Sequence, residues 1–217
     1  MRYAKEDVLP ADISYAQEPT PWDLGNDILY AMCRQHSGHR RADEIIAKIW
    51  LIGRSYAAAI ERRKNADDTT SDDFYERDVV NAMQSSGIDT WLESLPAFKS
   101  EPQTCARAAI EAHFNLVRVF SKLAHGQEKH SLASKYLHFH RPDVFFIYDS
   151  RAQAAITRVT PDIHFVDPPT LEKKDELYWQ FFSRCLWLRR KLAVPFGQPP
   201  TPREIDKVLL SVFNRKR

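Results

Sequence analysis

One stretch of the chain, from Ala133 to Ala155, holds side chains that can act on a substrate. It places Lys135, His138, His140 and Asp149 around an aromatic run that contains a single proline. A neutral lysine amine is a nucleophile, and a nearby carboxylate can steer a nucleophile or stabilise a developing positive charge. The same residue types also form ordinary salt bridges, and lone histidines more often pack than react. Support for either interpretation must come from the rest of the chain.

The elements around these residues would hold the carboxylate in place. Asp149 follows a short apolar segment, Val144 to Tyr148, that is predicted to be extended and buried. Asp is a favoured N-cap because its carboxylate accepts hydrogen bonds from the free N–H groups of the first helical turn. Asp149 is therefore predicted to begin a helix, in the positive field of the helix end. Lys135, on the preceding predicted helix, would then share a cleft with it.

The rest of the chain shows helical periodicity, and the predicted fold is all-α. Apolar residues recur at three- and four-residue spacing, and Gly126 is predicted to end a helix. We expect a polar segment over residues 1–20 and one helical domain over 21–217, built as two lobes that share one core. The predicted helices cover 21–35, 41–64, 72–84, the surroundings of Trp91, 104–124, 171–192 and a last helix that begins at Thr201.

Composition narrows the class of protein. With 217 residues, of which 43% are hydrophobic, the chain can bury a sizeable core, and its net charge is only +2. Residues 1–20 lack the apolar stretch of a signal peptide, and no apolar run in the sequence is long enough to span a membrane. The three cysteines are scattered, and their spacing predicts neither a disulfide framework nor a zinc site. We expect a cytoplasmic protein without a metal.

Two basic segments would follow a phosphate backbone if they shared a face: Arg34, Arg40, Arg41, Arg54, Arg62, Arg63 and Lys64, then Arg184, Arg189, Arg190 and Lys191.

The order of these parts resembles the helix-hairpin-helix DNA glycosylases, and specifically the 8-oxoguanine glycosylase-like fold. The matching pieces are the hairpin GQEK at 126–129, ASK at 133–135 and RPDVFFIYD at 141–149. IWLIGRSYAAAIERR at 49–63 is similar to the early helix that faces the gap left by an extruded base in that family. The resemblance covers about residues 45–160. It implies a DNA partner with a flipped base and no cofactor, since no four-cysteine iron–sulfur loop follows.

The resemblance also implies a role for each matching residue. Asp149 would be the catalytic carboxylate, and a lysine would attack C1′ of the sugar, form a Schiff base and permit strand cleavage. Lys129 lies at the family's usual distance from the aspartate, whereas Lys135 lies in the most distinctive run and is favoured narrowly. Without a reactive lysine, Asp149 and water would release the base. Contacts with nucleic acid would come from Arg54, Tyr56, His125, Gly126, His130, His138, His140 and Arg151.

Two other classes of function stay open. Arg107 and His113 in RAAIEAH are similar to the R-x4-6-H motif of the HEPN ribonucleases, although a separation of six places them on different helix faces. The chain would otherwise be a non-catalytic helical module that binds nucleic acid or protein, with Asp149 as a cap and Lys135 as its salt-bridge partner. Asn in place of Asp149 distinguishes these, because a cap tolerates Asn and a charged catalyst does not. Repair and defence against foreign DNA both suit a glycosylase.

Overall fold

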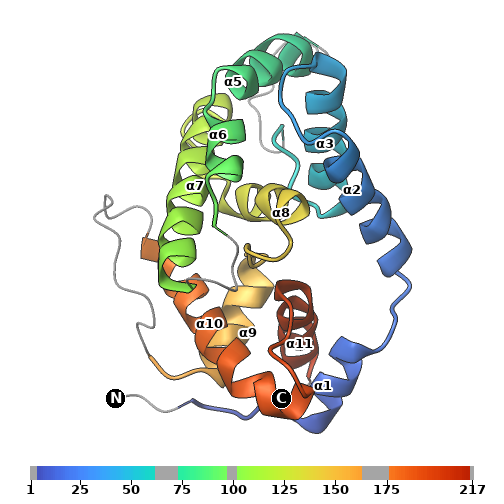
Figure 1. The fold of residues 1–217 in the computed structure, drawn as a ribbon, viewed down its shortest axis with the longest axis vertical. Helices are drawn as coiled ribbons and strands as arrows, with labels where there is room; N and C mark the ends of the chain where they lie inside the picture. The colour runs from blue at the N-terminus through green and yellow to red at the C-terminus, as the bar shows by residue number, and fades with distance from the viewer. Residues whose placement is uncertain (1–3, 62–72, 97–101, 163–175, 216–217) are drawn as a thin grey trace. The chain divides into compact units, whose positions relative to one another are not determined.

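The structure is a computed structural model that describes residues 4–61, 73–96, 102–162 and 176–215. Every regular element among these residues is a helix, and none is a strand (Figure 1), which confirms the all-α prediction. None of the helices in these ranges is both long enough and apolar enough to span a membrane.

The chain packs into two compact units, each assembled from separate stretches of sequence. One, here called the terminal unit, contains both chain ends and consists of Met1–Pro21, Pro96–Glu111 and Pro142–Arg217. The other, here called the hairpin unit, consists of Trp22–Leu95 and Ala112–Arg141. Helix α7 (Pro102–Leu123) contributes its first half to the terminal unit and its second half to the hairpin unit. Whether the units share one core stays a prediction.

In the hairpin unit, α8 (His130–His140) packs against both α2 (Asp23–Gln35) and α3 (Ala42–Ser55), as Figure 1 shows. Ile45, Ile49 and Ile52 repeat at helical spacing and are fully buried, as their pattern predicts. The remaining helical elements of this unit follow α3 in sequence and precede α7: the π-helix η1 (Phe74–Val79), α5 (Val80–Gln84) and α6 (Ile88–Glu93).

Helix α3 is shorter than its sequence pattern predicts, because it ends at Ser55 and not near Lys64. Ala57 has a left-handed backbone, with φ of 51°, and the Ala58 N–H donates to the Gly53 carbonyl at 2.8 Å, which closes the helix end. The chain then turns back tightly: a Cβ on Gly53 would lie 3.1 Å from the Ala59 Cα. The spacing of apolar residues continues past the end of the helix because Ile60, which is not helical, is also buried. Residues 62–72 lie outside the described ranges.

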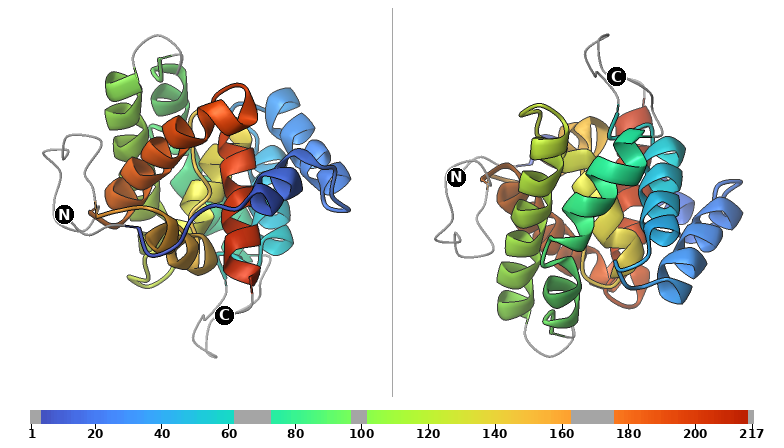
Figure 2. Two further views of the ribbon diagram at one scale, coloured as in Figure 1. Left: turned by 90° about the horizontal axis from the view of Figure 1, so that it is seen from below. Right: turned by 90° about the horizontal axis from the view of Figure 1, so that it is seen from above.

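In the terminal unit, α1 (Pro10–Gln17) and α9 (Ser150–Val159) both lie against α11 (Pro202–Asn214), as Figure 2 shows. The predicted capping box at Thr201 is confirmed, since its hydroxyl accepts from the Glu204 N–H at 3.1 Å. Sequence reasoning missed α1, which lies inside the segment expected to be only polar. Its Asp12 is buried and accepts from the Ser211 hydroxyl at 2.7 Å, which ties α1 to α11.

Helix α10 (Glu176–Phe196) completes the terminal unit and continues past the proline expected to end it, since Pro195 lies inside the helix. The start predicted at Leu171 falls outside the described residues. Its aromatic residues Tyr178, Trp179 and Phe182 are buried, so they pack in the interior of this unit as expected. The Tyr178 hydroxyl donates to the Phe146 carbonyl at 3.0 Å and so fixes the extended segment before Asp149.

Candidate functional site

A tight turn joins α7 to α8 at the place where the sequence resembles a glycosylase hairpin. His125 and Gly126 both have left-handed backbones, with φ of 49° and 84°. The Gly126 N–H donates to the Ser121 carbonyl at 2.8 Å and closes the end of α7. Gly126 thus ends the helix as predicted, because a residue without a Cβ adopts this backbone at little cost. The turn presents residues 127–129 immediately before α8.

The second half of α7 holds α8 through His113. This side chain is fully buried, its Nε2–H donates to the His130 carbonyl at 3.2 Å, and its ring stacks on that of His130 with centroids 5.6 Å apart. Burial lowers the pKa of His113 to about 3, so that the imidazole is neutral at ordinary pH. Arg107 belongs to the terminal unit. A buried, neutral histidine is poorly suited to act on RNA, so the surroundings of His113 give the ribonuclease hypothesis no support.

A pocket of about 500 Å³ lies beside the turn, within the hairpin unit. One part of its lining is the run Ala57–Ala59, where the chain turns after α3. The rest of the lining comes from the turn and the start of α8, and its residues are mostly polar: Gln127, Glu128, Lys129, Ser131 and Leu132. The pocket thus combines an apolar wall with hydrogen-bonding groups, as ligand sites commonly do.

Lys135 lies behind the Ser131 side of this pocket. Its side chain is buried, with 2% exposure, and its Nζ donates to the Ser131 Oγ at 2.7 Å. The same Nζ lies 5.6 Å from the centroid of the Tyr56 ring. Because Ser131 lines the pocket, the Lys135 amine is one hydrogen bond from the space.

Lys129, the competing nucleophile, lines the pocket directly. It is the N-cap residue of α8, it is half-buried, and its Nζ donates to the Gln127 Oε1 at 3.3 Å. Of the two candidate lysines, only Lys129 lines the pocket, and Lys135 is linked to it through the hydroxyl of Ser131. Lys129 lies in the wall, and Lys135 is enclosed behind it.

The other hairpin-unit residues predicted to bind nucleic acid differ in exposure. Arg54 is exposed, pairs with Glu61 and lies over the Trp50 ring at 5.8 Å. His125 is exposed on the turn, and the His130 Nε2 lies 3.2 Å from the Glu128 Oε2.

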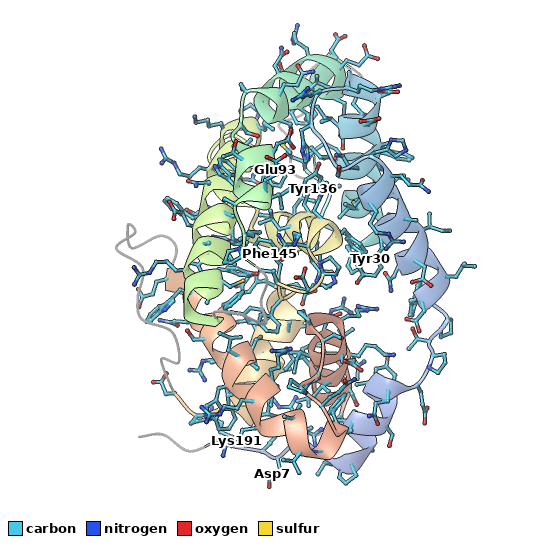
Figure 3. The ribbon with its side chains drawn as sticks, viewed as in Figure 1. Asp7, Tyr30, Glu93, Tyr136, Phe145 and Lys191 are labelled. Atoms are coloured by element: carbon cyan, nitrogen blue, oxygen red, sulfur yellow. The ribbon has the colours of Figure 1, made fainter. Side chains whose placement is uncertain are left out.

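His138 and His140 face the interior of the hairpin unit. His138 is fully buried, and its Nε2 lies 2.6 Å from the Tyr30 hydroxyl; Tyr30 is labelled in Figure 3. Burial, followed by the charge of Lys48, holds the pKa of His140 well below its usual value. The packing of at least one of these histidines was expected from their flanking Phe139. The imidazole of His138 is enclosed by protein in this structure, and its contact with DNA stays a prediction.

Asp149 begins α9 as predicted. Its Oδ1 accepts from the backbone N–H groups of Arg151 and Ala152, each at 3.0 Å. Burial, and secondarily the Asp149 charge, raises the pKa of the neighbouring Tyr148. Asp149 and the exposed Arg151 belong to the terminal unit, whereas Lys135 and Lys129 belong to the hairpin unit.

Sequence reasoning missed a buried polar cluster in the hairpin unit, here called the His39 cluster: His39, Lys48, Asp89 and Tyr136. The His39 Nδ1 donates to the Asp89 Oδ1 at 2.6 Å, and the Tyr136 hydroxyl donates to the His39 Nε2 at 2.7 Å; Figure 3 labels Tyr136. Lys48 is fully buried and donates to the carbonyls of His36 and Gly38, each at 2.7 Å. The one available signal was Lys48 itself, a cation on the apolar face of α3.

The His39 cluster is arranged to hold structure. Burial, reinforced by the charge of Lys48 and opposed by Asp89, lowers the pKa of His39 to about 4, and burial lowers the pKa of Lys48 to about 8. The lysine closes the loop after α2 by binding its carbonyls. His39 and Tyr136 are buried, with 2% and 0% exposure. We therefore place the candidate site at the hairpin pocket and not here.

Comparison with known proteins adds no assignment to this geometry. No protein-family model, curated protein or solved structure matches the chain. Within the described ranges, no three His, Cys, Asp or Glu side chains are grouped so that they could hold a metal ion. The candidate site is therefore defined by its own residues: the pocket wall with Lys129 and Ser131, and the amine of Lys135 behind it.

Proposed function

We propose that this protein excises a base from DNA in the manner of the helix-hairpin-helix glycosylases, with the Lys135 amine as the nucleophile. One observation carries the proposal: a buried lysine amine lies one hydrogen bond from an open pocket beside the hairpin turn. Enzymes commonly use enclosed lysines as nucleophiles, since the neutral amine reacts and burial disfavours the charged form. The resemblance of residues 45–160 to this family supports a lysine nucleophile in general, and the family's usual distance from the aspartate corresponds to Lys129.

The proposed chemistry uses few groups. A neutral amine bonds to C1′ of the deoxyribose while the bond between C1′ and the base nitrogen breaks, and the base leaves with that electron pair and gains a proton. The attached nitrogen loses one proton, and its lone pair then forms a double bond to C1′ as the bond between C1′ and the ring oxygen O4′ breaks. O4′ takes that electron pair and gains a proton, which leaves a protonated Schiff base that permits strand cleavage. Asp149 would stabilise the positive charge that develops on the sugar, a role that the resemblance alone implies.

Borohydride trapping tests the proposal. The purified protein is incubated with duplexes that carry modified bases or an abasic site, and borohydride reduces any Schiff base to a stable amine. We expect a one-to-one adduct whose peptide mass maps to Lys135. Lys135→Ala and Lys135→Arg are expected to abolish it, and Lys129→Ala, the matched control from the same pocket, to retain it.

The other outcomes are equally informative. An adduct on Lys129 would reassign the nucleophile within the same pocket and overturn the role given to Lys135. Base release without any adduct would indicate a glycosylase that uses water. Neither adduct nor base release on the whole panel would overturn the enzymatic proposal and favour a helical binding module.

A further inference from the structure

We infer that Ser131 and Tyr56 are positioning residues for the Lys135 amine, with separable tasks: Ser131 aims the amine at the pocket, and Tyr56 favours its charged form. The role in a reaction rests on the proposed function. The contacts themselves stand on the geometry of the hairpin unit, where all three residues lie. The two tasks predict different effects of substitution, which makes them distinguishable from simple packing.

Ser131 has the position and chemistry to aim the amine. It precedes Lys135 by four residues on α8, so both side chains project from one face of the helix. Its Oγ lies 2.7 Å from the Lys135 Nζ, and its side chain forms part of the pocket wall. A hydroxyl accepts from an ammonium and donates to the lone pair of a neutral amine. Ser131 can therefore hold the nitrogen at the wall in both protonation states.

Tyr56 acts through its ring. The ring centroid lies 5.6 Å from the Lys135 Nζ, a range at which an aromatic face attracts a cation but not a neutral amine. The ring is itself held in place, because its hydroxyl donates to the Asn26 Oδ1 at 2.7 Å and it packs edge-on against Phe139 at 5.5 Å. This contact favours the charged form of Lys135. When the ring is removed, the neutral and reactive amine is expected to form at lower pH.

The test measures trapping rates on an abasic-site duplex from pH 5 to pH 9, with cyanoborohydride as the reductant. Ser131→Ala is expected to lower the maximal rate at least tenfold, and Ser131→Thr, which retains the hydroxyl, to restore most of it. Tyr56→Leu is expected to move the pH of half-maximal rate down by about one unit, the size of a partly buried cation–π contact. Tyr56→Phe retains the ring and is expected to keep the wild-type midpoint.

A second measurement separates this inference from the proposed function. Protein labelled with ¹³C at lysine Cε is titrated without DNA, and the Lys135 signal is assigned as the one missing from Lys135→Arg. A lower midpoint in Tyr56→Leu, alongside a wild type that gives neither an adduct nor base release, would support the Tyr56 contact and overturn the glycosylase proposal. An unchanged midpoint in Tyr56→Leu together with a wild-type rate in Ser131→Ala would overturn the inference. Tyr30→Phe, which loses a hydroxyl bonded to His138, is the matched control.

Discussion

At the scale of single residues, Asp149 has two roles that one substitution can separate. Its Oδ1 caps α9 through the N–H groups of Arg151 and Ala152, and the proposed reaction also uses its charge. Asn caps a helix about as well as Asp, whereas Ala in place of a cap costs about 1 kcal/mol. We therefore expect Asp149→Asn to leave the free energy of unfolding within about 0.5 kcal/mol of wild type but to reduce borohydride trapping at least a hundredfold.

Urea unfolding and trapping on the same preparations give both quantities. Asp149→Ala is the companion variant and is expected to lose stability as well as trapping. Wild-type trapping by Asp149→Asn would show that the carboxylate acts only as a helix cap. The glycosylase proposal would then need another group to stabilise the sugar.

A hydrogen bond could be predicted from the sequence only where its donor and acceptor lie close together along the chain. The Asp149 cap was predictable because donors and acceptor lie within three residues. The Tyr56 hydroxyl and Asn26 are thirty residues apart, and His39 and Asp89 fifty, so only the folded chain brings these pairs together. Lys135 was singled out from its sequence context, but its enclosure behind the pocket was not predictable.

At the scale of elements, the early end of α3 creates one wall of the pocket, and it does so at a cost. Ala57 has φ of 51°, a left-handed backbone that costs an alanine about 1 kcal/mol relative to glycine. Periodicity did not predict this turn, because the buried Ile60 continues the apolar spacing after the helix has ended. This part of the pocket therefore depends on the left-handed backbone of Ala57, which the pattern of apolar residues does not predict.

Ala57→Gly should relieve this strain. We expect the variant to raise the free energy of unfolding by about 0.5 to 1 kcal/mol, measured by urea denaturation. Ala58→Gly is the matched control: its backbone is not left-handed, so added freedom in the unfolded chain should lower stability. Equal effects of the two substitutions would contradict a strained Ala57.

At the scale of the whole molecule, acid stability should be governed by histidines that the fold keeps neutral. Burial lowers the pKa of His39 to about 4 and that of His113 to about 3, and it also lowers the pKa of His140. All three lie in the hairpin unit. In the unfolded chain they titrate near pH 6.5, so between pH 6.5 and about 4 the unfolded state binds more protons. Their contribution to stability is therefore complete above pH 6.5 and is lost as the pH falls.

The size of the effect sets the test. One proton of difference changes the free energy of unfolding by about 1.4 kcal/mol per pH unit, so His39 and His113 together give a slope of about 3 kcal/mol per unit near pH 5, to which His140 adds. Urea unfolding between pH 7.5 and 4.5 measures this slope. His39→Gln should reduce this slope by about 1.4 kcal/mol per unit, the share of one histidine. A slope below about 1.4 kcal/mol per unit would mean that the histidines take up protons in the folded state, and the enclosure of α8 and the His39 cluster would then be weaker than the structure indicates.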